Sequence, residues 1–542
     1  MQKNGKLELT WVGKYEQKEI EPRILVENPE LSYGDQDTGN MLIHGDNLIA
    51  LKALEQDYAG KIKCIYIDPP YNTGSAFEYY DDGLEHSEWL NMMRPRLEIL
   101  HNLLADDGFF CCHIDDSEGS YLKCLCDEIF GRINYLSTFY IQVRYPNKTL
   151  AEDSDYQKVI EQILIYAGDK TRSRVNRPTE EYAIDKFIWK INELEKGEEI
   201  ELGRKRVVVF KPGQYSIEKI EPSLSGLKET WATGSLSRVK ASAGEFFELY
   251  LADRKPTDGL GCLYKVYGIG EDGLGYRYIS GPKKESANKG KFYSGIPINR
   301  LNELKNGSSV KKKPVANFYD FAGGFGNCRL EGGVGFRGGK KPEILLQTIM
   351  NYFTNEGDLV LDSFLGSGTT IAVAQKMNRR WIGIELGEHA YSLCKVRLDN
   401  VIDGDKTGIS KDLNWQGGGG YKFYELAPSL LVPNPKLPTI KQINPEYTFE
   451  MMCEAICKLE GFKYKPDGKF HGKSSEQRFI HITKEFVNGE YINSLLANLG
   501  EGQSLLVYGM KIQSDLRLSD NIIVKKIPKD LLDKCTFESE VK

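Results

Sequence analysis

Residues 63–74 constrain the fold of this chain more than any other stretch, and they read Lys-Cys-Ile-Tyr-Ile-Asp-Pro-Pro-Tyr-Asn-Thr-Gly. The apolar, β-branched run Cys64–Ile67 stops at Asp68-Pro69-Pro70, which predicts a buried strand that ends in a rigid loop. Ligands of an open α/β sheet bind outside the carboxyl ends of its strands, so Asp68 and Tyr71 are expected to face a crevice. An aspartate before two prolines also occurs in ordinary loops, so the rest of the chain has to decide whether this loop is functional.

The side chains of this loop suit the exocyclic amine of a nucleobase. Two successive prolines fix φ and remove two donors, which leaves the Asp68 carboxylate and the neighbouring carbonyl groups as preorganised acceptors. An exocyclic amine donates from two N–H groups and is a poor nucleophile, because its lone pair is delocalised into the ring. Acceptors aimed at both hydrogens would draw the nitrogen toward an attacking geometry, and the flat ring of Tyr71 offers a surface on which the base could stack.

A second strand, loop and helix pattern lies far along the chain, at Leu359–Thr370, where Phe364-x-Gly366-x-Gly368 forms the loop. The strand after that helix, Trp381–Ile384, ends in Glu385. A glycine loop in a βαβ unit, followed about 20 residues on by an acid, is typical of nucleoside cofactor sites, in which the acid binds the ribose hydroxyl groups. Gly-x-Gly alone would also fit a dinucleotide, but the third glycine of that fingerprint is missing because position 371 is Ile.

The segment before the first loop completes a βαβ unit. Asn40–Asn47 predicts a strand, and Leu48, Leu51 and Leu54 fall on one face of the helix that follows. Asp46 therefore also lies at the carboxyl end of a strand. On its own, this position favours a helix N-cap over a ligand contact.

Between the two halves, residues 132–334 lack the regular βα pattern. Short strand-like runs alternate there with loops rich in Gly, Ser, Lys and Asn, and basic clusters such as Lys311-Lys312-Lys313 recur among tyrosines and phenylalanines. These residue types contact phosphates and bases, although a run of charge also fits a solvated surface. We interpret the segment as a target-recognition region, with Lys311, Lys312 and Lys313 as candidate DNA contacts.

The composition bounds the remaining possibilities. At 542 residues the chain is long enough for several domains, and its net charge of −6 means that a nucleic-acid surface has to come from local basic clusters. The 11 cysteines show no Cys-x2-Cys pair, so we expect reduced thiols and no metal site. No apolar stretch is long enough to cross a membrane and no signal region follows the first residues, so the expected location is cytoplasmic.

The order of the two loops resembles the permuted motif order of β-class DNA amino-methyltransferases, in the aspartate form typical of adenine-N6 enzymes. After the first loop, Ser87–Leu104 predicts a helix, because Trp89, Met93, Leu97 and Leu100 are apolar at helical spacing. Together with the first loop and its neighbouring strands, this helix resembles more narrowly the modification subunits of Type III restriction systems, a likeness that covers residues 1–170 and 335–430. The resemblance implies that the catalytic loop is formed by Asp68, Pro69, Pro70 and Tyr71. It implies that the cofactor is bound by Asp46, Asp68, Phe364, Gly366, Gly368 and Glu385, with Asp46 beside the adenine and Glu385 at the ribose. Lys341-Pro342-Glu343 matches the helix that enters the cofactor-binding half.

The resemblance also implies an α/β fold, namely a doubly wound, Rossmann-like and circularly permuted methyltransferase sheet with an inserted target-recognition region and a small C-terminal α/β domain. The expected domains are an N-terminal arm (1–40), the catalytic half (41–131), the target-recognition region (132–334), the cofactor-binding half (335–430) and the C-terminal domain (431–542).

The implied function is transfer of the methyl group of S-adenosyl-L-methionine to N6 of a flipped adenine at specific sites in double-stranded DNA, in a bacterial cytoplasm and without a metal. The implied partners are a second copy of the chain and a separate ATP-dependent restriction subunit, since this chain has no phosphate-cradling Gly-x4-Gly-Lys-Ser/Thr loop for ATP. Two alternatives stay open. One is N4-cytosine methylation, whose enzymes usually carry serine where Asp68 stands, and the other is a non-catalytic DNA-recognition subunit, which the intact motifs disfavour.

Overall fold

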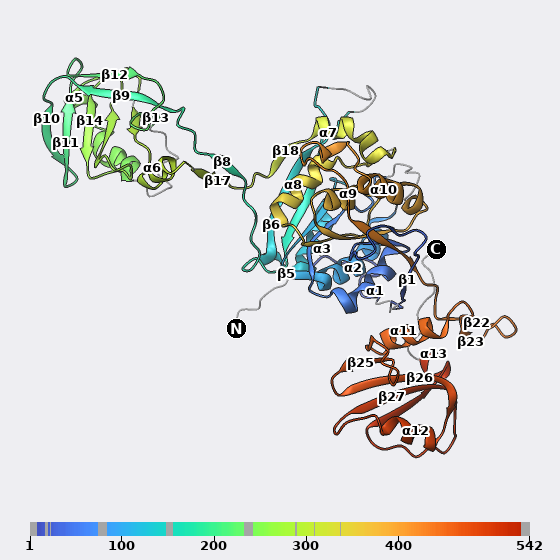
Figure 1. The fold of residues 1–542 in the computed structure, drawn as a ribbon. Coiled ribbons are helices and arrows are strands. Elements are labelled where there is room, and N and C mark those ends of the chain that lie inside the picture. Colours follow the sequence, from blue (N-terminus) through green and yellow to red (C-terminus); the bar gives the residue numbers. More distant parts are fainter. Residues whose placement is uncertain are drawn as a thin grey trace. The chain divides into compact units, whose positions relative to one another are not determined.

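The computed structural model describes residues 8–16, 20–21, 23–73, 84–147, 155–231, 242–287, 290–307, 309–336 and 338–532. The chain divides into two compact units, of which the larger is made of Met1–Asn176 and Ala316–Lys542 and the smaller of Arg177–Val315 (Figure 1). Each unit is described by itself.

The larger unit is built on an eleven-stranded sheet whose central strands are parallel. Nine of its strands, in spatial order, are β21 (Gly420–Leu426), β3 (Met41–His44), β20 (Arg380–Glu385), β19 (Leu359–Asp362), β4 (Ile62–Ile67), β5 (Leu104–Ile114), β7 (Ile160–Ala167), β6 (Tyr135–Gln142) and β18 (Phe318–Asp320). Two short strands, β1 (Leu25–Glu27) and β2 (Tyr33–Gly34), pair with β21. All four residues of β19 are buried, as expected for a parallel strand that is covered on both faces.

The centre of this sheet joins two distant parts of the chain. Val360 of β19 lies opposite Cys64 of β4, and Leu361 lies opposite Ile65. From β19 the chain crosses to β20 on one side, whereas from β4 it crosses to β5 on the other, so the pair forms a topological switch point. The predicted doubly wound, permuted sheet is therefore confirmed, and its switch point brings the two predicted loops to one edge.

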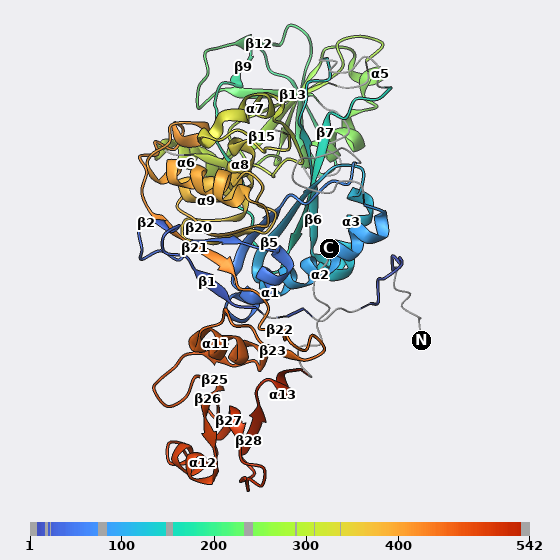
Figure 2. The same cartoon turned by 90° about the vertical axis from the view of Figure 1, so that its right-hand side faces the viewer.

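Helices cover both faces of the sheet (Figure 2). The first face carries α1 (Asn47–Tyr58), α2 (His86–Leu103) and α3 (Gly119–Cys126), which is continued by a π-helical turn (Asp127–Gly131). The other carries α8 (Glu343–Phe353), α9 (Thr369–Lys376), a π-helical segment (Ala390–Lys395) and α10 (Val396–Ile402). Helix α2 follows the predicted spacing, because Trp89, Met93, Leu97 and Leu100 are all fully buried in the core beneath it. Short helices, α7 (Ala322–Asn327) and a 3-10 segment (Cys328–Gly333), precede α8.

The smaller unit is an eight-stranded antiparallel sheet. In spatial order its strands are β10 (Glu198–Leu202), β11 (Lys205–Phe210), β14 (Leu263–Tyr267), β15 (Tyr276–Ser280), β16 (Lys291–Ser294), β13 (Leu227–Trp231), β9 (Phe187–Glu193) and β12 (Tyr215–Lys219). One face packs against the helical residues 242–251, while the other has an aromatic core that includes Phe210 and Tyr293. Across this second face Glu193 accepts from Lys265 Nζ at 2.7 Å, although their strands are not neighbours, so the sheet is strongly curved.

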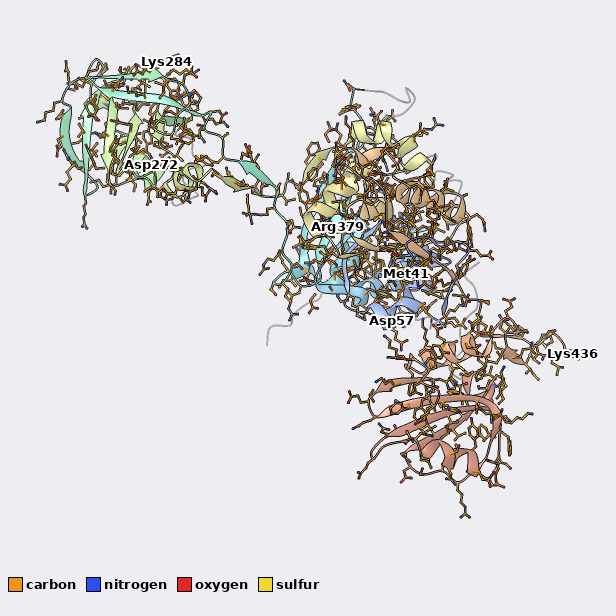
Figure 3. All side chains as sticks on the ribbon, viewed as in Figure 1. Met41, Asp57, Asp272, Lys284, Arg379 and Lys436 are labelled. Carbon is orange, nitrogen blue, oxygen red and sulfur yellow. The ribbon has the colours of Figure 1, made fainter. Side chains whose placement is uncertain are left out.

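Loops and short elements complete the smaller unit. Asp272 accepts from the backbone N–H of Gly295 at 2.8 Å and so joins two loops, and Figure 3 labels it among the side chains of this unit. The short helices of the smaller unit are α4 (Ser242–Phe246), α5 (Lys255–Asp258) and α6 (Ile298–Lys305). Strands β8 (Thr179–Glu181) and β17 (Val310–Lys312) form a two-stranded ribbon. The unit is shorter at both ends than the predicted region 132–334, because β6, β7 and β18 belong to the large sheet.

Residues 431–532 form a small α/β arrangement. The ribbon β22 (Leu431–Pro433) and β23 (Lys441–Ile443) is followed by a five-stranded sheet in the order β24 (Lys463–Tyr464), β25 (Gly472–Ser475), β26 (Arg478–Val487), β27 (Ser504–Ile512) and β28 (Ile522–Lys526). Three helices accompany it, namely α11 (Phe449–Leu459), α12 (Gly489–Leu496) and α13 (Lys529–Leu532). Among the residues that the structure describes, no helix is long and apolar enough to cross a membrane.

Candidate active site

The Asp-Pro-Pro-Tyr loop leaves the carboxyl end of β4 and is fixed at several points. The indole Nε1 of Trp89 on α2 donates to the Pro70 carbonyl at 2.8 Å. Asn72 adopts φ +59°, a left-handed conformation that asparagine tolerates better than most residues. Its Nδ2 donates to Leu84 O at 2.8 Å and to the fully buried Glu118 at 2.6 Å, so the loop is held on both sides of Tyr71.

Both oxygens of the Asp68 carboxylate have partners. Lys341 Nζ lies 2.8 Å from Asp68 Oδ2, and the hydroxyl of Tyr71 donates to Asp68 Oδ1 at 2.9 Å. The same hydroxyl lies 3.0 Å from Glu161 Oε2, and Lys341 Nζ lies 5.0 Å from the centroid of the Tyr71 ring. Because 21% of the Asp68 side chain is exposed, the carboxylate is oriented by the protein yet still open on one side.

A buried polar layer supports these contacts. His113 Nε2 lies 2.9 Å from Glu161 Oε2, and His113 Nδ1 lies 2.7 Å from the hydroxyl of Tyr66. Burial by itself would raise the pKa of Glu161, but Lys341, His113 and Tyr71 lower that pKa to about 2. Burial would lower the pKa of Lys341, yet Asp68 and Glu161 raise it. Glu161 and Lys341 are therefore both charged at neutral pH.

Sequence reasoning missed part of this cluster. Glu161 lies on β7, inside the segment interpreted as target recognition, and His113 lies within the apolar strand β5. A single polar residue in such a strand carries no local signal of function. Lys341 was assigned only to the entry of a helix, although a lysine directly before Pro342 at the end of a glycine-rich loop was visible in the sequence.

The glycine loop follows β19, the neighbour of β4. Gly366 and Gly368 have φ +55° and +75°, and a Cβ built on Gly366 would meet no atom within 4 Å. Phe364 is buried, and its backbone N–H donates to Asp362 Oδ1 at 2.9 Å. The loop therefore exposes backbone at Gly366 beside an open space, which suits close approach of a ligand.

Glu385 ends β20 and is tied to the glycine loop. Its Oε2 accepts from the Gly366 N–H at 2.7 Å, and its Oε1 accepts from the Leu386 and Gly387 N–H groups at 2.8 and 3.2 Å. The side chain is only 1% exposed. The carboxylate thus shapes the loop directly, in addition to the ribose contact that the resemblance implies.

Asp46 serves as the N-cap of α1, as its position alone had favoured. Its Oδ1 accepts from the N–H groups of Leu48 and Ile49 at 2.9 and 3.2 Å. Its Oδ2 lies 3.4 Å from Arg96 Nη2, and 36% of the side chain is exposed. Capping therefore occupies Oδ1 and leaves the carboxylate open at a strand end two strands away from β19.

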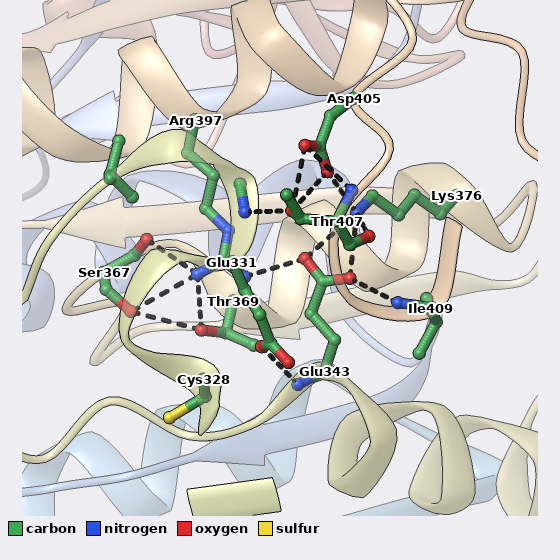
Figure 4. A network of polar contacts seen from close by, with 12 residues as sticks. Cys328, Glu331, Glu343, Ser367, Thr369, Lys376, Arg397, Asp405, Thr407 and Ile409 are labelled. Atoms are coloured by element: carbon green, nitrogen blue, oxygen red, sulfur yellow. Dashed lines mark hydrogen bonds and ion pairs between the residues drawn. The ribbon is translucent and has the colours of Figure 1, made fainter. Parts of the chain in front are cut away.

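An internal ionic network holds the glycine loop in place (Figure 4). Arg397 Nη1 donates to Thr369 Oγ1 at 2.7 Å, and its Nη2 lies 2.8 Å from Glu343 of α8. Glu343 also lies 2.8 Å from Lys376 Nζ, which contacts Asp405 at 2.8 Å. The side chains of Glu343, Lys376 and Arg397 are fully buried, so the start of α9 is fixed by charge-assisted contacts.

The predicted site residues fall into two groups. Asp46, Asp68, the glycine loop and Glu385 all lie at the carboxyl ends of the neighbouring strands β3, β4, β19 and β20. Lys311, Lys312 and Lys313 belong to the other unit, on or next to β17, and Lys313 forms an ion pair with Glu180. Their assignment to DNA stays a prediction. Among the described residues, no group of His, Cys, Asp and Glu could hold a metal ion.

The sequence matches known DNA-modifying proteins. The family model for DNA methylases matches residues 62–396. The probable type III restriction-modification enzyme HindVI Mod subunit of Haemophilus influenzae is 34% identical over 408 residues, which cover 72% of this chain and 54% of that relative. The type III restriction-modification enzyme EcoPI Mod subunit of Escherichia phage P1 is 26% identical over 458 residues, which cover 74% of this chain and 65% of that relative. The chain thus spans about half to two thirds of the length of these relatives.

A solved structure also matches the chain. The PvuII DNA methyltransferase, described as cytosine-N4-specific, is 13% identical, with a match that covers 73% of this chain and 94% of that protein at a TM-score of 0.33.

Proposed function

The chain belongs to the DNA methylase family, and we propose that it is a site-specific DNA methyltransferase that transfers the methyl group of S-adenosyl-L-methionine to N6 of adenine. The observation that carries this proposal is the place of the Asp68-Pro69-Pro70-Tyr71 loop. It lies beside the glycine loop, on neighbouring strands at the switch point of the sheet. A base held by the first loop and a cofactor held by the second would meet there.

The catalytic loop would act on the target amine. Asp68 and the carbonyl groups beside it accept from the amine, while the nitrogen gives its lone pair to the methyl carbon as the carbon–sulfur bond breaks. The nitrogen gains positive charge in that step and afterwards releases a proton to water, which reaches the open side of Asp68. A carboxylate next to the nitrogen therefore stabilises the transition state more than the ground state. Lys341 lies over one face of the Tyr71 ring, so the base would stack on the other face after leaving the duplex.

The glycine loop fits the cofactor. S-adenosyl-L-methionine supplies an activated methyl group on a sulfonium, so no metal is required. The open space at Gly366 admits the ligand close to the backbone, Phe364 packs behind the loop, and Gly368 starts α9. Glu385 and Asp46 would contact the ribose and the adenine from the ends of β20 and β3.

Two features support adenine and a Type III system. The first residue of the catalytic loop is aspartate, the form typical of adenine-N6 enzymes. Two relatives are named as Mod subunits of type III restriction-modification enzymes. We therefore propose double-stranded DNA as the substrate, a second copy of this chain as a partner, and a separate restriction subunit as a further partner.

Methylation by the purified chain tests the proposal. DNA from a methylation-free host should incorporate labelled methyl groups from S-adenosyl-L-methionine, and sequencing should locate N6-methyladenine at one motif. The Asp68→Ala variant should lose turnover by about 10²-fold or more, while its affinities for cofactor and DNA stay close to those of the wild type.

A matched control comes from the same sheet edge. Asp116 follows β5, one strand beyond β4, and is 68% exposed, so Asp116→Ala should leave turnover intact. Near-normal turnover of Asp68→Ala would remove Asp68 from the catalytic role. If the product is N4-methylcytosine, the target base is cytosine and not adenine.

A further inference from the structure

The catalytic aspartate belongs to a cluster of three charged side chains that come from three separate parts of the chain. Asp68 follows β4, Glu161 lies on β7, and Lys341 stands just before α8. The exposed fractions of their side chains are 21%, 20% and 7%. Because two carboxylates face one ammonium group, the cluster carries a net negative charge at the edge where the methyl group would be transferred.

We propose that Lys341 and Glu161 are positioning residues for methyl transfer, an inference that rests on the proposed function. Lys341 fixes the Asp68 carboxylate through Oδ2, whereas Glu161 shares the single hydroxyl proton of Tyr71 with Asp68 and balances Lys341. The single uncompensated negative charge of the cluster then matches the positive charge that the target amine acquires.

The contacts of Lys341 define the orientation of Asp68. With Nζ 2.8 Å from Oδ2 and the Tyr71 hydroxyl 2.9 Å from Oδ1, the carboxylate cannot rotate without breaking a charge-assisted contact. Each carboxylate oxygen has two lone pairs, so each partner leaves one free for the amine. An aspartate without these partners would have to be ordered by the substrate, and that ordering would raise the barrier of the reaction.

Glu161 offsets part of the positive charge that Lys341 presents to Asp68. Its Oε2 lies 3.8 Å from Lys341 Nζ and 3.0 Å from the Tyr71 hydroxyl. His113 Nε2 lies 2.9 Å from the same Glu161 oxygen and supports it from the buried side. Without Glu161, Lys341 would neutralise Asp68 fully, and the amine would gain its positive charge next to a cluster with no net charge.

Three variants, with a fourth as control, test the inference by single-turnover methylation at saturating cofactor and DNA. Lys341→Met should lower the rate constant about 10²-fold, and Glu161→Gln about 10-fold, because interactions preorganised for the transition state are removed. Lys341→Arg keeps the positive charge, so its rate constant should be at least about tenfold higher than that of Lys341→Met. The dissociation constants for cofactor and DNA should stay within roughly threefold of the wild type in all variants.

Lys123→Met is the matched control. Lys123 Nζ pairs with Asp127 at 2.7 Å and lies 4.2 Å from the Tyr135 ring centroid, so it combines a carboxylate and a tyrosine ring as Lys341 does, but on α3. Its variant should methylate at the wild-type rate. Thermal unfolding of every variant separates loss of fold from loss of rate.

The outcomes are distinct. A wild-type rate for Lys341→Met, a loss confined to the dissociation constants, or a loss that Lys341→Arg does not reduce would each overturn the positioning role while leaving the proposed function intact. Absence of methyl transfer by the wild-type protein would overturn the proposed function and this inference together.

Discussion

At the scale of single residues, Asp362 is the carboxyl whose folded environment opposes its charge most clearly. It ends β19, is 2% exposed, and accepts from Thr370 Oγ1 at 2.5 Å. Burial raises its pKa to about 7, and the nearby Asp68 and Glu385 add to that rise, although contacts with Thr370 and the Phe364 N–H oppose it. The folded protein therefore binds this proton more tightly than the unfolded chain does.

A pH dependence of stability follows from this pKa. The protonated Asp362 carboxyl contributes roughly 4 kcal/mol to the free energy of unfolding. This contribution is fully present below about pH 4 and is lost as the pH rises through 7. Asp362→Asn has no proton to lose, so the difference in unfolding free energy between variant and wild type should shift in favour of the variant between pH 5 and pH 8. Calorimetric unfolding across this range measures it, and a constant difference would show that the carboxyl titrates at its ordinary pKa.

Gly366 gives a second prediction for a single residue. Gly366→Val should weaken S-adenosyl-L-methionine binding, because valine strains a position at φ +55° and fills the space that the ligand would enter. Gly357→Val is the control, since Gly357 also has a positive φ, +79°, and open space at its Cβ, but lies in an exposed turn before β19. Titration calorimetry should show at least a tenfold loss only for Gly366→Val. Equal affinities would place the cofactor elsewhere.

Glu385→Ala should also weaken cofactor binding, through two causes. It removes the implied ribose contact, and it frees the Gly366 N–H that Glu385 now holds at 2.7 Å. Calorimetry with the cofactor and with a fragment that lacks the ribose separates the two causes. A loss with both ligands indicates distortion of the loop, a loss with the intact cofactor alone indicates the ribose contact, and unchanged affinity for both would exclude Glu385 from the cofactor site.

At the scale of elements, α8, α9 and α10 depend on one buried set of charges. Glu343 of α8 contacts both Lys376 of α9 and Arg397 of α10. Glu343→Gln would leave two buried cations partly unpaired, which typically costs about 3–5 kcal/mol of unfolding free energy. Glu98→Gln, which breaks the partly exposed i,i+4 pair with Arg94 on α2, should cost less than about 1 kcal/mol. A loss below about 1 kcal/mol for Glu343→Gln in chemical unfolding would show that Lys376 and Arg397 are not left unpaired by the substitution.

The elements also show what local sequence can and cannot predict. Spacing predicted α2, the strand end at Asp68 and the glycine loop, because each is set by residues that are close in sequence. Glu161 could not be found in this way. It joins the Asp68 cluster only because β7 pairs antiparallel with β5 and because β5 lies next to β4, and such long-range pairings leave no trace in the local pattern. Strands β6 and β7 pair antiparallel with each other and so depart from the βα pattern, and for that reason the sequence did not show that they belong to the large sheet.

At the scale of the whole molecule, charge is distributed unevenly. Residues 177–315 hold 25 Lys and Arg against 19 Asp and Glu, a net charge of +6, although the whole chain carries −6. The remainder is therefore strongly acidic, and the smaller unit is the part whose charge suits DNA.

Exchange of residues 177–315 for the corresponding segment of a related enzyme should redirect methylation to another sequence without loss of cofactor binding. Methylation of the original sequence by the exchanged protein would place recognition outside this unit.

The lysines at the end of the smaller unit separate general from specific DNA contacts. Lys311 and Lys312 are exposed on β17, whereas Lys313 is paired with Glu180. If they contact phosphates, replacing all three by alanine should weaken binding to every DNA sequence alike, and the slope of log affinity against log salt should become shallower by about 0.9 per lost contact. Because Glu180 already neutralises Lys313, we expect the slope to change by an amount closer to two lost contacts than to three.

Glu180→Ala frees Lys313 and should steepen the slope instead. Titrations at several salt concentrations, with target and unrelated duplexes, measure both changes, and a loss confined to the target duplex would show that these lysines contact bases rather than phosphates.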